Sequence, residues 1–412
     1  MIKSETSSNV LQATTVDYTT ISVRNLFYFF PVILLLGRWY LTGFFLVVLF
    51  IFLILEKLTF EKLEVKLSNT TAWGFTFIWG LYILLKSPKV WNGFIFYVGQ
   101  HPFYDGIAYY IGLIIIPFII MTFFKNIDLD EIFLYNLFNI FTITGVILSL
   151  LSAMQFIVSG FNTTLRIYSV WPDLNIYATY LMILFFFNLA FIVGGGKKEH
   201  NILRYTSIVI IGLGVFLTQT RAAWLAIVIS IVIFFVKRPK IIIPAFLVIA
   251  LFLILFKDAI LTRYITFVNF SSDVSTLGRF QAWYATYLLL TENFLTGYGF
   301  DAFLYYKDTV YSGYLLFLPH SHNTFLRGLL EMGLIGVIIY FFLFFKAAVV
   351  SFKMKAGKEY AFLTKYIDGL QLTFIGLFVV FMFEPFFSLY SNAAIIVWTF
   401  ISLSICIKEA YF

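Results

Sequence analysis

The sequence predicts an all-α protein that crosses a membrane many times. Of its 412 residues, 61% are hydrophobic and only 12% are charged, and the mean hydropathy is +0.93. A soluble domain of this length needs more polar side chains to cover its surface. The apolar runs are continuous and long enough to cross a bilayer, which favours spanning helices over the alternating strands of a membrane barrel.

The apolar runs predict about 12 transmembrane helices in a single membrane domain, residues 1–412. The expected spans are 26–40, 41–56, 72–86, 106–124, 133–158, 174–194, 203–219, 221–237, 240–257, 323–345, 368–385 and 392–408. Only Gly37, Arg38 and Trp39 separate the first two, so a hairpin and one broken helix are both open. Residues 1–24 are polar and lack an apolar core and a small-residue cleavage site, so we expect a cytoplasmic tail and not a removable signal peptide.

The distribution of lysine indicates which loops face the cytoplasm, because lysine and arginine accumulate there. With both termini inside, the inner loops hold most of the basic residues: Lys57, Lys62, Lys66, Lys125, Lys197, Lys198, Arg204, Lys237, Arg238, Lys240, Lys346, Lys353, Lys355, Lys358 and Lys365. The outer loops hold fewer lysines, with Lys86, Lys89, Lys257 and Lys307 as exceptions, and carry Arg166, Arg221, Arg263 and Arg279. Anionic lipid head groups account for the net charge of +7 without a nucleic-acid partner. The single cysteine excludes an internal disulfide.

One large extracytoplasmic insert, residues 258–322, precedes span ten. Within it, the segment LGRFQAWYATYLLL places Leu277, Phe280, Tyr284, Tyr287 and Leu288 at helical spacing. This pattern predicts an amphipathic helix along the outer surface, with its aromatic side chains at the level of the lipid head groups. The following GYGF, residues 297–300, is either a plain turn or a place where the backbone approaches another segment closely.

Two of the four histidines lie in LPHSHNTFLRGLLEMGLIG, residues 318–336, at the outer start of span ten. Asn323 and Thr324 supply N-cap chemistry for the helix that follows. Residues two apart in an extended segment point the same way, so we expect His320 and His322 to face the same cavity. A single histidine here is more simply a satisfied polar group at the membrane interface, so the neighbouring residues decide the interpretation.

The neighbours that matter are two arginines on the same side of the membrane. Arg221, in TQTRAAWLA, lies between two spans with no acidic residue in its own hairpin, and Arg279 lies on the amphipathic helix. Either arginine alone could be a solvated or snorkelling cation. Together they fit a diphosphate, because each guanidinium donates paired hydrogen bonds to phosphate oxygens. A histidine beside them can take a proton from an attacking hydroxyl, which fits displacement of a diphosphate leaving group.

These segments resemble the O-antigen ligase and Wzy-type polymerase superfamily. The resemblance rests on TQTRAAWLA, on GRFQAWYATYLLL followed by LTGYGFDAF, and on PHSHNTFLRGLLEMGLIG, and it covers roughly residues 217–336. The segment WPDLNIYA around Asn175 is similar to a weaker family block. The resemblance implies a polytopic glycosyltransferase of the GT-C type, without metal or other cofactor. It implies a site on the periplasmic or outer side of the cytoplasmic (inner) membrane, where a glycan is taken from undecaprenyl diphosphate.

The resemblance also implies roles for individual residues. Arg221 and Arg279 would hold the diphosphate, and His322 would be the base or position the acceptor, while we expect His320 and Asn323 to contact substrate. An alternative is a metal bound by the two histidines with Asp301 or Glu331, although no clear third ligand is evident. We expect Glu331, about two turns inside span ten, to be a structural partner of a cavity arginine or amide.

The shared segments leave the acceptor open. We favour an O-antigen ligase, whose acceptor is the lipid A core oligosaccharide, over a Wzy-type polymerase of O-antigen, capsule or exopolysaccharide repeat units. A polysaccharide or lipid transporter or flippase would also have many spans. A transporter predicts paired halves with broken helices at the midplane of the membrane. The sequence shows no such symmetry, and its polar groups gather at the outer rim, which favours chemistry there over transport.

Overall fold

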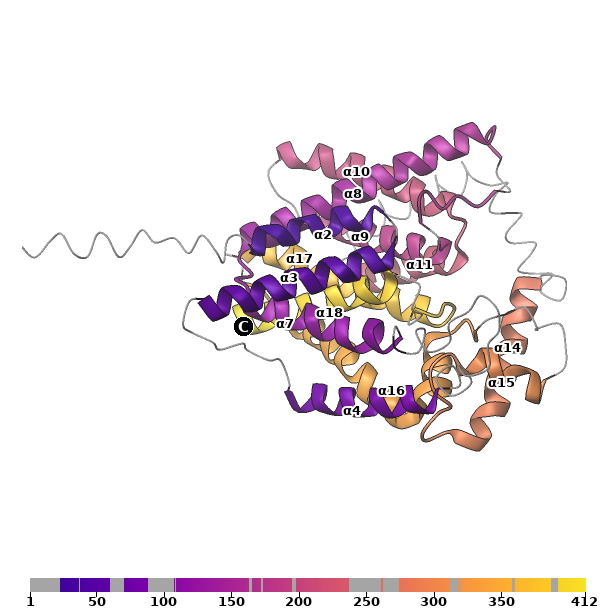
Figure 1. Ribbon diagram of the computed structural model, residues 1–412. Coiled ribbons are helices and arrows are strands. Elements are labelled where there is room, and N and C mark those ends of the chain that lie inside the picture. Colours follow the sequence, from indigo (N-terminus) through magenta and orange to yellow (C-terminus); the bar gives the residue numbers. More distant parts are fainter. Residues whose placement is uncertain are drawn as a thin grey trace, which may run out of the picture.

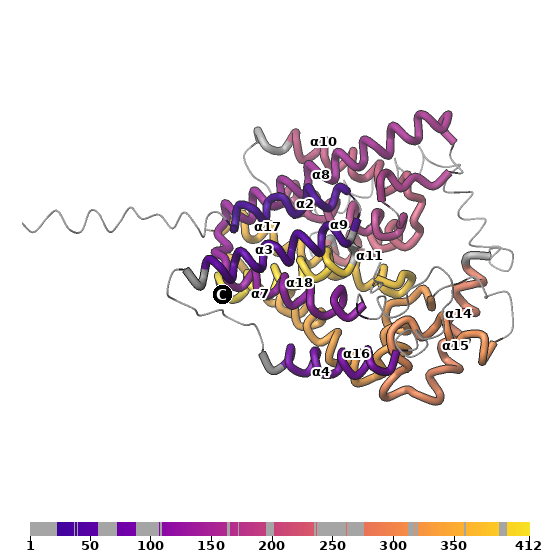
Figure 2. Tube along the Cα trace, viewed as in Figure 1, coloured from indigo at the N-terminus to yellow at the C-terminus, as the bar shows by residue number. Residues whose placement is uncertain are grey.

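The computed structural model describes residues 23–36, 38–59, 70–87, 107, 109–162, 165–171, 173–194, 198–236, 261, 274–311, 318, 320–357, 360–386 and 392–412. Within these ranges the chain forms helices and no strand, as predicted. Most helices run alongside one another in a bundle, and two further helices, α14 and α15, lie beyond one end of it (Figure 1). The chain trace shows the same arrangement, with the C-terminus at the opposite end (Figure 2).

The bounds of the elements follow chain order. They are η1 (Phe27–Phe29), α2 (Phe30–Leu34), α3 (Trp39–Thr59), α4 (Thr70–Lys86), the π-helical turn η3 (Ile111–Ile115), α7 (Ile116–Asn126), α8 (Glu131–Val158), α9 (Leu174–Val193), α10 (Lys198–Leu217), α11 (Arg221–Val236), α14 (Val274–Asn293), α15 (Ala302–Val310), α16 (Thr324–Lys353), α17 (Ala361–Phe381) and α18 (Asn392–Tyr411). The first two expected spans are therefore two separate helices.

The helices confirm a multi-pass membrane protein. Five of the described helices, α8, α9, α16, α17 and α18, are long and apolar enough to cross a membrane. Shorter apolar helices occupy the other expected spans: Val23–Leu34, Tyr40–Glu56, Ala72–Lys86, Ile111–Asn126, Ile202–Leu217 and Arg221–Phe234. The span expected at 240–257 and the polar tail at 1–22 lie outside the described residues, so the count of twelve stays a prediction.

Helix α9 forms the centre of the bundle and packs against α8, α10, α11, α17 and α18. Aromatic rings fill this centre, for example Phe187 of α9 against Tyr366 of α17 and Phe400 of α18, at centroid distances of 5.0 and 5.3 Å. Large apolar side chains also cover the outside of the bundle: Ile78 is 71% exposed and Val158 is 86% exposed. An apolar exterior around a packed aromatic core is what lipid surroundings require.

Contacts between side chains show which helix ends lie together at each end of the bundle. At one end, Lys125 of α7 pairs with Glu409 of α18 at 3.6 Å, and the rings of Tyr360 and Tyr411 lie 6.3 Å apart. This end therefore joins the last turn of α7, the start of α17 and the end of α18. The start of α16, the end of α17 and the α10–α11 hinge lie at the other end, which α14 and α15 extend (Figure 1).

Helix α16 is broken at Gly333, whose φ of +69° and ψ of 178° lie outside the helical region. The break frees the carbonyl groups of the preceding turn, and an unsatisfied backbone group costs several kcal/mol inside a membrane. The segment 294–299 fills the break. Tyr298 and Gly299 donate their backbone N–H groups to Leu330 and Glu331 at 2.7 and 2.9 Å, and the N–H groups of Leu334 and Ile335 are taken by the carbonyls of Phe294 and Leu295.

The two glycines of GYGF allow this insertion, so of the two interpretations left open by the sequence the structure shows the close approach of the backbone. Gly297 and Gly299 have φ values of +65° and +97°. A Cβ atom on Gly297 would lie 2.5 Å from the backbone nitrogen of Gly333, and one on Gly299 would lie 2.5 Å from the Cα of Ser87. Only glycine avoids both the steric strain of this conformation and the collision.

The segment predicted as an amphipathic helix forms α14, whereas its place along the outer membrane surface stays a prediction. Phe280, Tyr284 and Tyr287 are 51%, 53% and 62% exposed along one face, whereas Ala282 and Ala285 on the other face are fully buried. The buried face packs with Tyr298, Phe303 and Leu330 in a small apolar cluster of its own. Small residues on this face let α14 lie close to α15 and to the upper turns of α16, and they leave the large rings outside.

Candidate functional site

The histidine segment ends where α16 begins, and the Asn323 side chain fixes this junction against the backbone at the end of α17. Asn323 is the N-cap of α16, as predicted: its side-chain oxygen accepts from the backbone N–H of Leu326 at 2.9 Å. The amide nitrogen of Asn323 donates to the carbonyl of Met382 at 2.9 Å, so it also ties α16 to the end of α17. Since both ends of this amide are engaged, the predicted contact of Asn323 with substrate stays a prediction.

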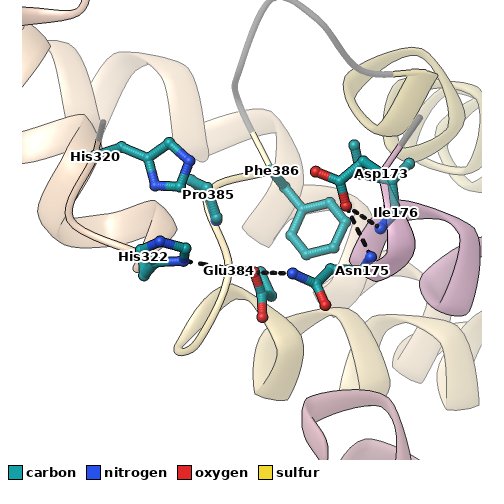
Figure 3. Close-up of a pocket in the computed structure, with 8 residues that line it drawn as sticks. All are labelled: Asp173, Asn175, Ile176, His320, His322, Glu384, Pro385 and Phe386. Carbon is teal, nitrogen blue, oxygen red and sulfur yellow. Dashed lines mark hydrogen bonds and ion pairs between the residues drawn. The ribbon is translucent and has the colours of Figure 1, made fainter. Parts of the chain in front are cut away.

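His320 and His322 face the same pocket, as predicted (Figure 3). Their ring centroids are 4.3 Å apart with the planes inclined by 64°. His322 has a φ of +48°, a conformation that few residues other than glycine adopt and that recurs at functional sites. The pocket has a volume of about 80 Å³ and is lined by Asp173, Asn175, Ile176, His320, His322, Glu384, Pro385 and Phe386.

Glu384, in the turn after α17, lies at the centre of the charged groups around this pocket. Its carboxylate accepts from Asn175 Nδ2 at 2.8 Å and pairs with Arg279 at 3.1 Å, and Nδ1 of His322 lies 3.9 Å away. The Glu384 side chain is only 4% exposed. A buried carboxylate is tolerated when donors and an opposite charge surround it. Glu384 is not among the site residues predicted from the sequence.

Asn175 extends the cluster toward a third arginine. Its side-chain oxygen accepts from Arg166 at 3.2 Å, and Arg166 also donates to the carbonyl of Thr218 at 3.1 Å. Arg166 therefore ties the start of α9 to the short hinge between α10 and α11. Asp173 caps α9 by accepting from the backbone N–H groups of Asn175 and Ile176. Burial raises the pKa of Asp173, and the nearby charge of Glu384 adds to this shift.

Arg279 and Arg221 occupy different positions in the site. Arg279 pairs with Glu384 at the centre of the site. The Nε atom of Arg279 is buried without a hydrogen-bond partner in the described part of the chain. Arg221 is the first residue of α11 and donates to Thr276 of α14 at 3.4 Å. The structure therefore brings Arg279, His320 and His322 together, and it places Arg221 at the edge, in contact with the helix that carries Arg279.

His320 is a poor candidate for a base. Burial lowers its pKa to about 2, and the charge of Arg327 contributes further to the shift. At neutral pH the imidazole therefore stays neutral and has little tendency to take a proton. His322 is 18% exposed, and its Nδ1 lies 3.9 Å from Oε2 of Glu384, a carboxylate that can orient the ring.

Arg327, Glu331 and Asp301 form a second buried cluster just below the histidines. Arg327 Nε donates to Glu331 at 2.7 Å, and its Nη2 lies 3.5 Å from Asp301 and 3.2 Å from the hydroxyl of Tyr109. The prediction that Glu331 is the structural partner of an arginine is confirmed. The two carboxylates that a metal site with the histidines would need are bound to this arginine. Within the described ranges, no three His, Cys, Asp or Glu side chains are grouped as metal ligands.

The missed residues had only weak sequence signals. Glu384 lies near the end of the apolar run predicted as a span over 368–385, in FMFEPFF. A carboxylate there is costly unless it has a partner. The partners of Glu384 lie 62 to 209 residues away in the chain, and no sequence pattern connects them. Asp173 and Asn175 lie in WPDLNIYA, which the sequence analysis noted without assigning a role. Arg166 was noted as an outer arginine.

The site thus combines a cationic side chain, an imidazole and a carboxylate at the mouth of a membrane bundle. The arginine can neutralise an anionic group, and the imidazole can exchange a proton with a hydroxyl beside it. The carboxylate can orient the imidazole and stabilise its charged form. This arrangement suits transfer of a group away from an anionic leaving group.

Comparison with known proteins agrees with this chemistry. Residues 206–341 match the family model described as O-antigen ligase (Wzy_C). No curated protein matches the chain. The matched segment runs from within α10 into α16, so it holds Arg221, Arg279, His320 and His322, whereas Arg166, Asn175 and Glu384 lie outside it. The described helices are those of a multi-pass membrane protein, and residues 206–341 are similar to an O-antigen ligase domain, as the sequence segments predicted.

Proposed function

We propose that the protein transfers a glycan from undecaprenyl diphosphate to a hydroxyl group of an acceptor glycan. The family supports a membrane glycosyltransferase of the ligase or polymerase type. The single observation that carries the donor assignment is the position of Arg279, beside His322 at the mouth of the bundle with a buried Nε that no described residue satisfies. An anionic leaving group would satisfy this guanidinium.

In the proposed step, the acceptor hydroxyl oxygen forms a bond to the anomeric carbon of the donor sugar. The bond from that carbon to the diphosphate oxygen breaks, and undecaprenyl diphosphate leaves with the electron pair. His322 takes the hydroxyl proton, while Arg279 and Arg221 offset the charge that develops on the leaving diphosphate. No step uses a metal ion. His320, which stays neutral, orients groups in the pocket by hydrogen bonding.

We propose that the site faces the periplasm or the cell exterior. The lysines at the opposite end, among them Lys125 and Lys408 in the last turns of α7 and α18, support a cytoplasmic location for that end. We favour a lipid A core oligosaccharide as the acceptor, with polymerisation of repeat units as the second candidate, because the large insert around α14 and α15 offers a surface for a separate acceptor.

Transport is a weaker candidate. The break in α16 is the feature that a transporter would share, since broken helices line transport sites. Here the backbone of residues 294–299 fills the break and pairs with its free backbone groups. The charged residues instead gather at one rim, which supports chemistry at the membrane surface.

The test is single-turnover transfer from purified undecaprenyl-diphosphate glycan to acceptor, in detergent with a chelator. We expect His322→Ala to slow transfer by roughly two to four orders of magnitude, the usual contribution of a general base, and to leave donor binding intact. His320→Ala should slow transfer less. His200, near the start of α10, supplies the matched control, and His200→Ala should transfer at the wild-type rate.

Two results would contradict the proposal. Transfer that depends on an added divalent ion would replace the histidine base with metal chemistry. A His320→Ala variant that is inactive beside an active His322→Ala variant would move the base two residues upstream.

A further inference from the structure

Glu384 lies outside the segment that matches the O-antigen ligase family, yet its carboxylate binds Asn175 and Arg279 and lies 3.9 Å from His322. Its position is fixed from two directions. Its backbone N–H donates to Val380 at 3.0 Å, and its carbonyl accepts from the hydroxyl of Thr324 at 2.5 Å. The same hydroxyl accepts from the backbone N–H of Phe386 at 3.0 Å. The turn is thus held against α16 two residues after His322.

The Glu384 side chain connects three separate parts of the chain. One oxygen, Oε1, pairs with Arg279 of α14, and the other, Oε2, accepts from Asn175 of α9. Oε2 is also the oxygen 3.9 Å from Nδ1 of His322. Because Arg166 holds Asn175 in turn, the carboxylate has little freedom to turn away. Figure 3 shows Glu384 between His322 and Asn175 at the pocket.

A fixed carboxylate beside Nδ1 has two effects on an imidazole. It favours the tautomer with the proton on Nδ1, which leaves Nε2 free to take a proton from a hydroxyl. It also stabilises the imidazolium that forms when the proton arrives. The distance of 3.9 Å is longer than a hydrogen bond, and catalytic hydrogen bonds often tighten only when substrate binds.

The pairing with Arg279 gives a reason for such tightening. In the structure, the guanidinium of Arg279 pairs with Glu384, and the Nε atom of Arg279 has no hydrogen-bond partner among the described residues. A diphosphate that bound to Arg279 would draw positive charge away from Glu384. The carboxylate would then interact more strongly with its remaining neighbour that can become charged, His322.

We propose that Glu384 is a positioning residue that orients His322 for proton transfer and couples this role to donor binding through Arg279. The proposal rests on the proposed function, since it assigns His322 as the base. The carboxylate keeps its charge throughout: the acceptor proton moves to His322 Nε2, and the electron pair of the broken bond leaves with the diphosphate.

The test measures single-turnover transfer as a function of pH for wild type, Glu384→Gln and Glu384→Asp. We expect Glu384→Gln to slow transfer by about 100-fold or more. Since the neutral amide no longer stabilises the imidazolium, the midpoint at which the rate falls in acid should move to lower pH by about one unit. Glu384→Asp keeps the charge but withdraws it by one methylene group, so we expect a slower rate with an unchanged midpoint.

The matched control is Glu409→Gln in α18, at the other end of the bundle. Glu409 also pairs with one cation and is 47% exposed, and its variant should keep both the rate and the pH midpoint of wild type. A Glu384→Gln variant with the wild-type midpoint would overturn the proposal even if its rate were low, because a purely structural carboxylate affects the rate alone. Glu384→Asp at the wild-type rate would overturn it as well, including where Glu384→Gln folds poorly.

These outcomes separate the inference from the proposed function. If wild type transfers glycan from undecaprenyl diphosphate and depends on His322, the proposed function stands whatever the Glu384 variants do. If wild type does not transfer, or His322→Ala is active, the proposed function fails before Glu384 is considered.

Discussion

The break in α16 predicts a large loss of stability for Gly333→Ala. A Cβ atom at this position would lie 2.3 Å from the carbonyl oxygen of Leu295 and 2.6 Å from the backbone nitrogen of Gly297. Alanine in this backbone conformation, with a φ of +69° and a ψ of 178°, costs about 1–3 kcal/mol by itself. Backbone atoms cannot yield as a side chain can, so the segment 294–299 must move away from α16. This separates four backbone hydrogen bonds worth about 1 kcal/mol each, and the total reaches about 5–7 kcal/mol.

The assay heats purified protein in detergent and records the fraction that stays monodisperse at each temperature. Gly74→Ala in α4 is the matched control, because a Cβ atom there meets nothing within 4 Å. That substitution should be neutral or stabilise the helix by about 0.5–1 kcal/mol. If Gly333→Ala and Gly74→Ala unfold at the same temperature, the docked segment does not support the break as described.

Two further predictions concern the site. Arg221→Lys and Arg279→Lys should each slow transfer by about tenfold or more, because an ammonium loses the paired contact worth about 1.5–3 kcal/mol. Arg24→Lys is the matched control, because Arg24 is 19% exposed, against 22% for Arg279, and is likewise paired with one carboxylate. This variant should transfer at the wild-type rate. Wild-type rates in all three variants would contradict the proposed contact of the arginines with the diphosphate. The second prediction is that His320 makes the fold sensitive to acid. Its pKa of about 2 in the folded protein lies below the ordinary value near 6.5, so the unfolded chain binds more protons between these values. Stability therefore falls as pH drops through that window, by about 2 kcal/mol at pH 5. Unfolding temperatures of His320→Gln and wild type, compared at pH 7 and pH 5, should diverge in favour of the variant at pH 5, and parallel curves would contradict this.

The sequence predicted the features that depend on local pattern. Continuous apolar runs predicted the helices, and the aromatic spacing of 277–287 predicted α14. Asn323 was expected to be an N-cap because its residue type and its place before an apolar run are local signals. His320, His322 and Arg279 were predicted as site residues because they lie in short segments that resemble those of a known family.

Long-range pairing could not be predicted in the same way. Glu384 acquires its role from Asn175 and Arg279, which are 209 and 105 residues away. The glycines of GYGF indicated a close approach, but the broken turn of α16 that they approach has no signal of its own beyond Gly333. Arg221 was expected to share the ligand with Arg279, and the structure places it at the edge, through Thr276.

The filled break in α16 also has a consequence for biogenesis. If the site faces outward as proposed, the segment 294–299, which precedes α16 in the chain, crosses the bilayer before the upper turns of α16 can pair their backbone groups with it. Lys307, which lies between the two and is held by the carbonyl of Leu318, has to cross as well. Insertion of α16 would thus complete the packing of α14 and α15 against the start of α16. If translocation of α14 and α15 stalled, the first turns of α16, which follow the histidines, would lack partners for their backbone groups. They could then not insert stably into the membrane.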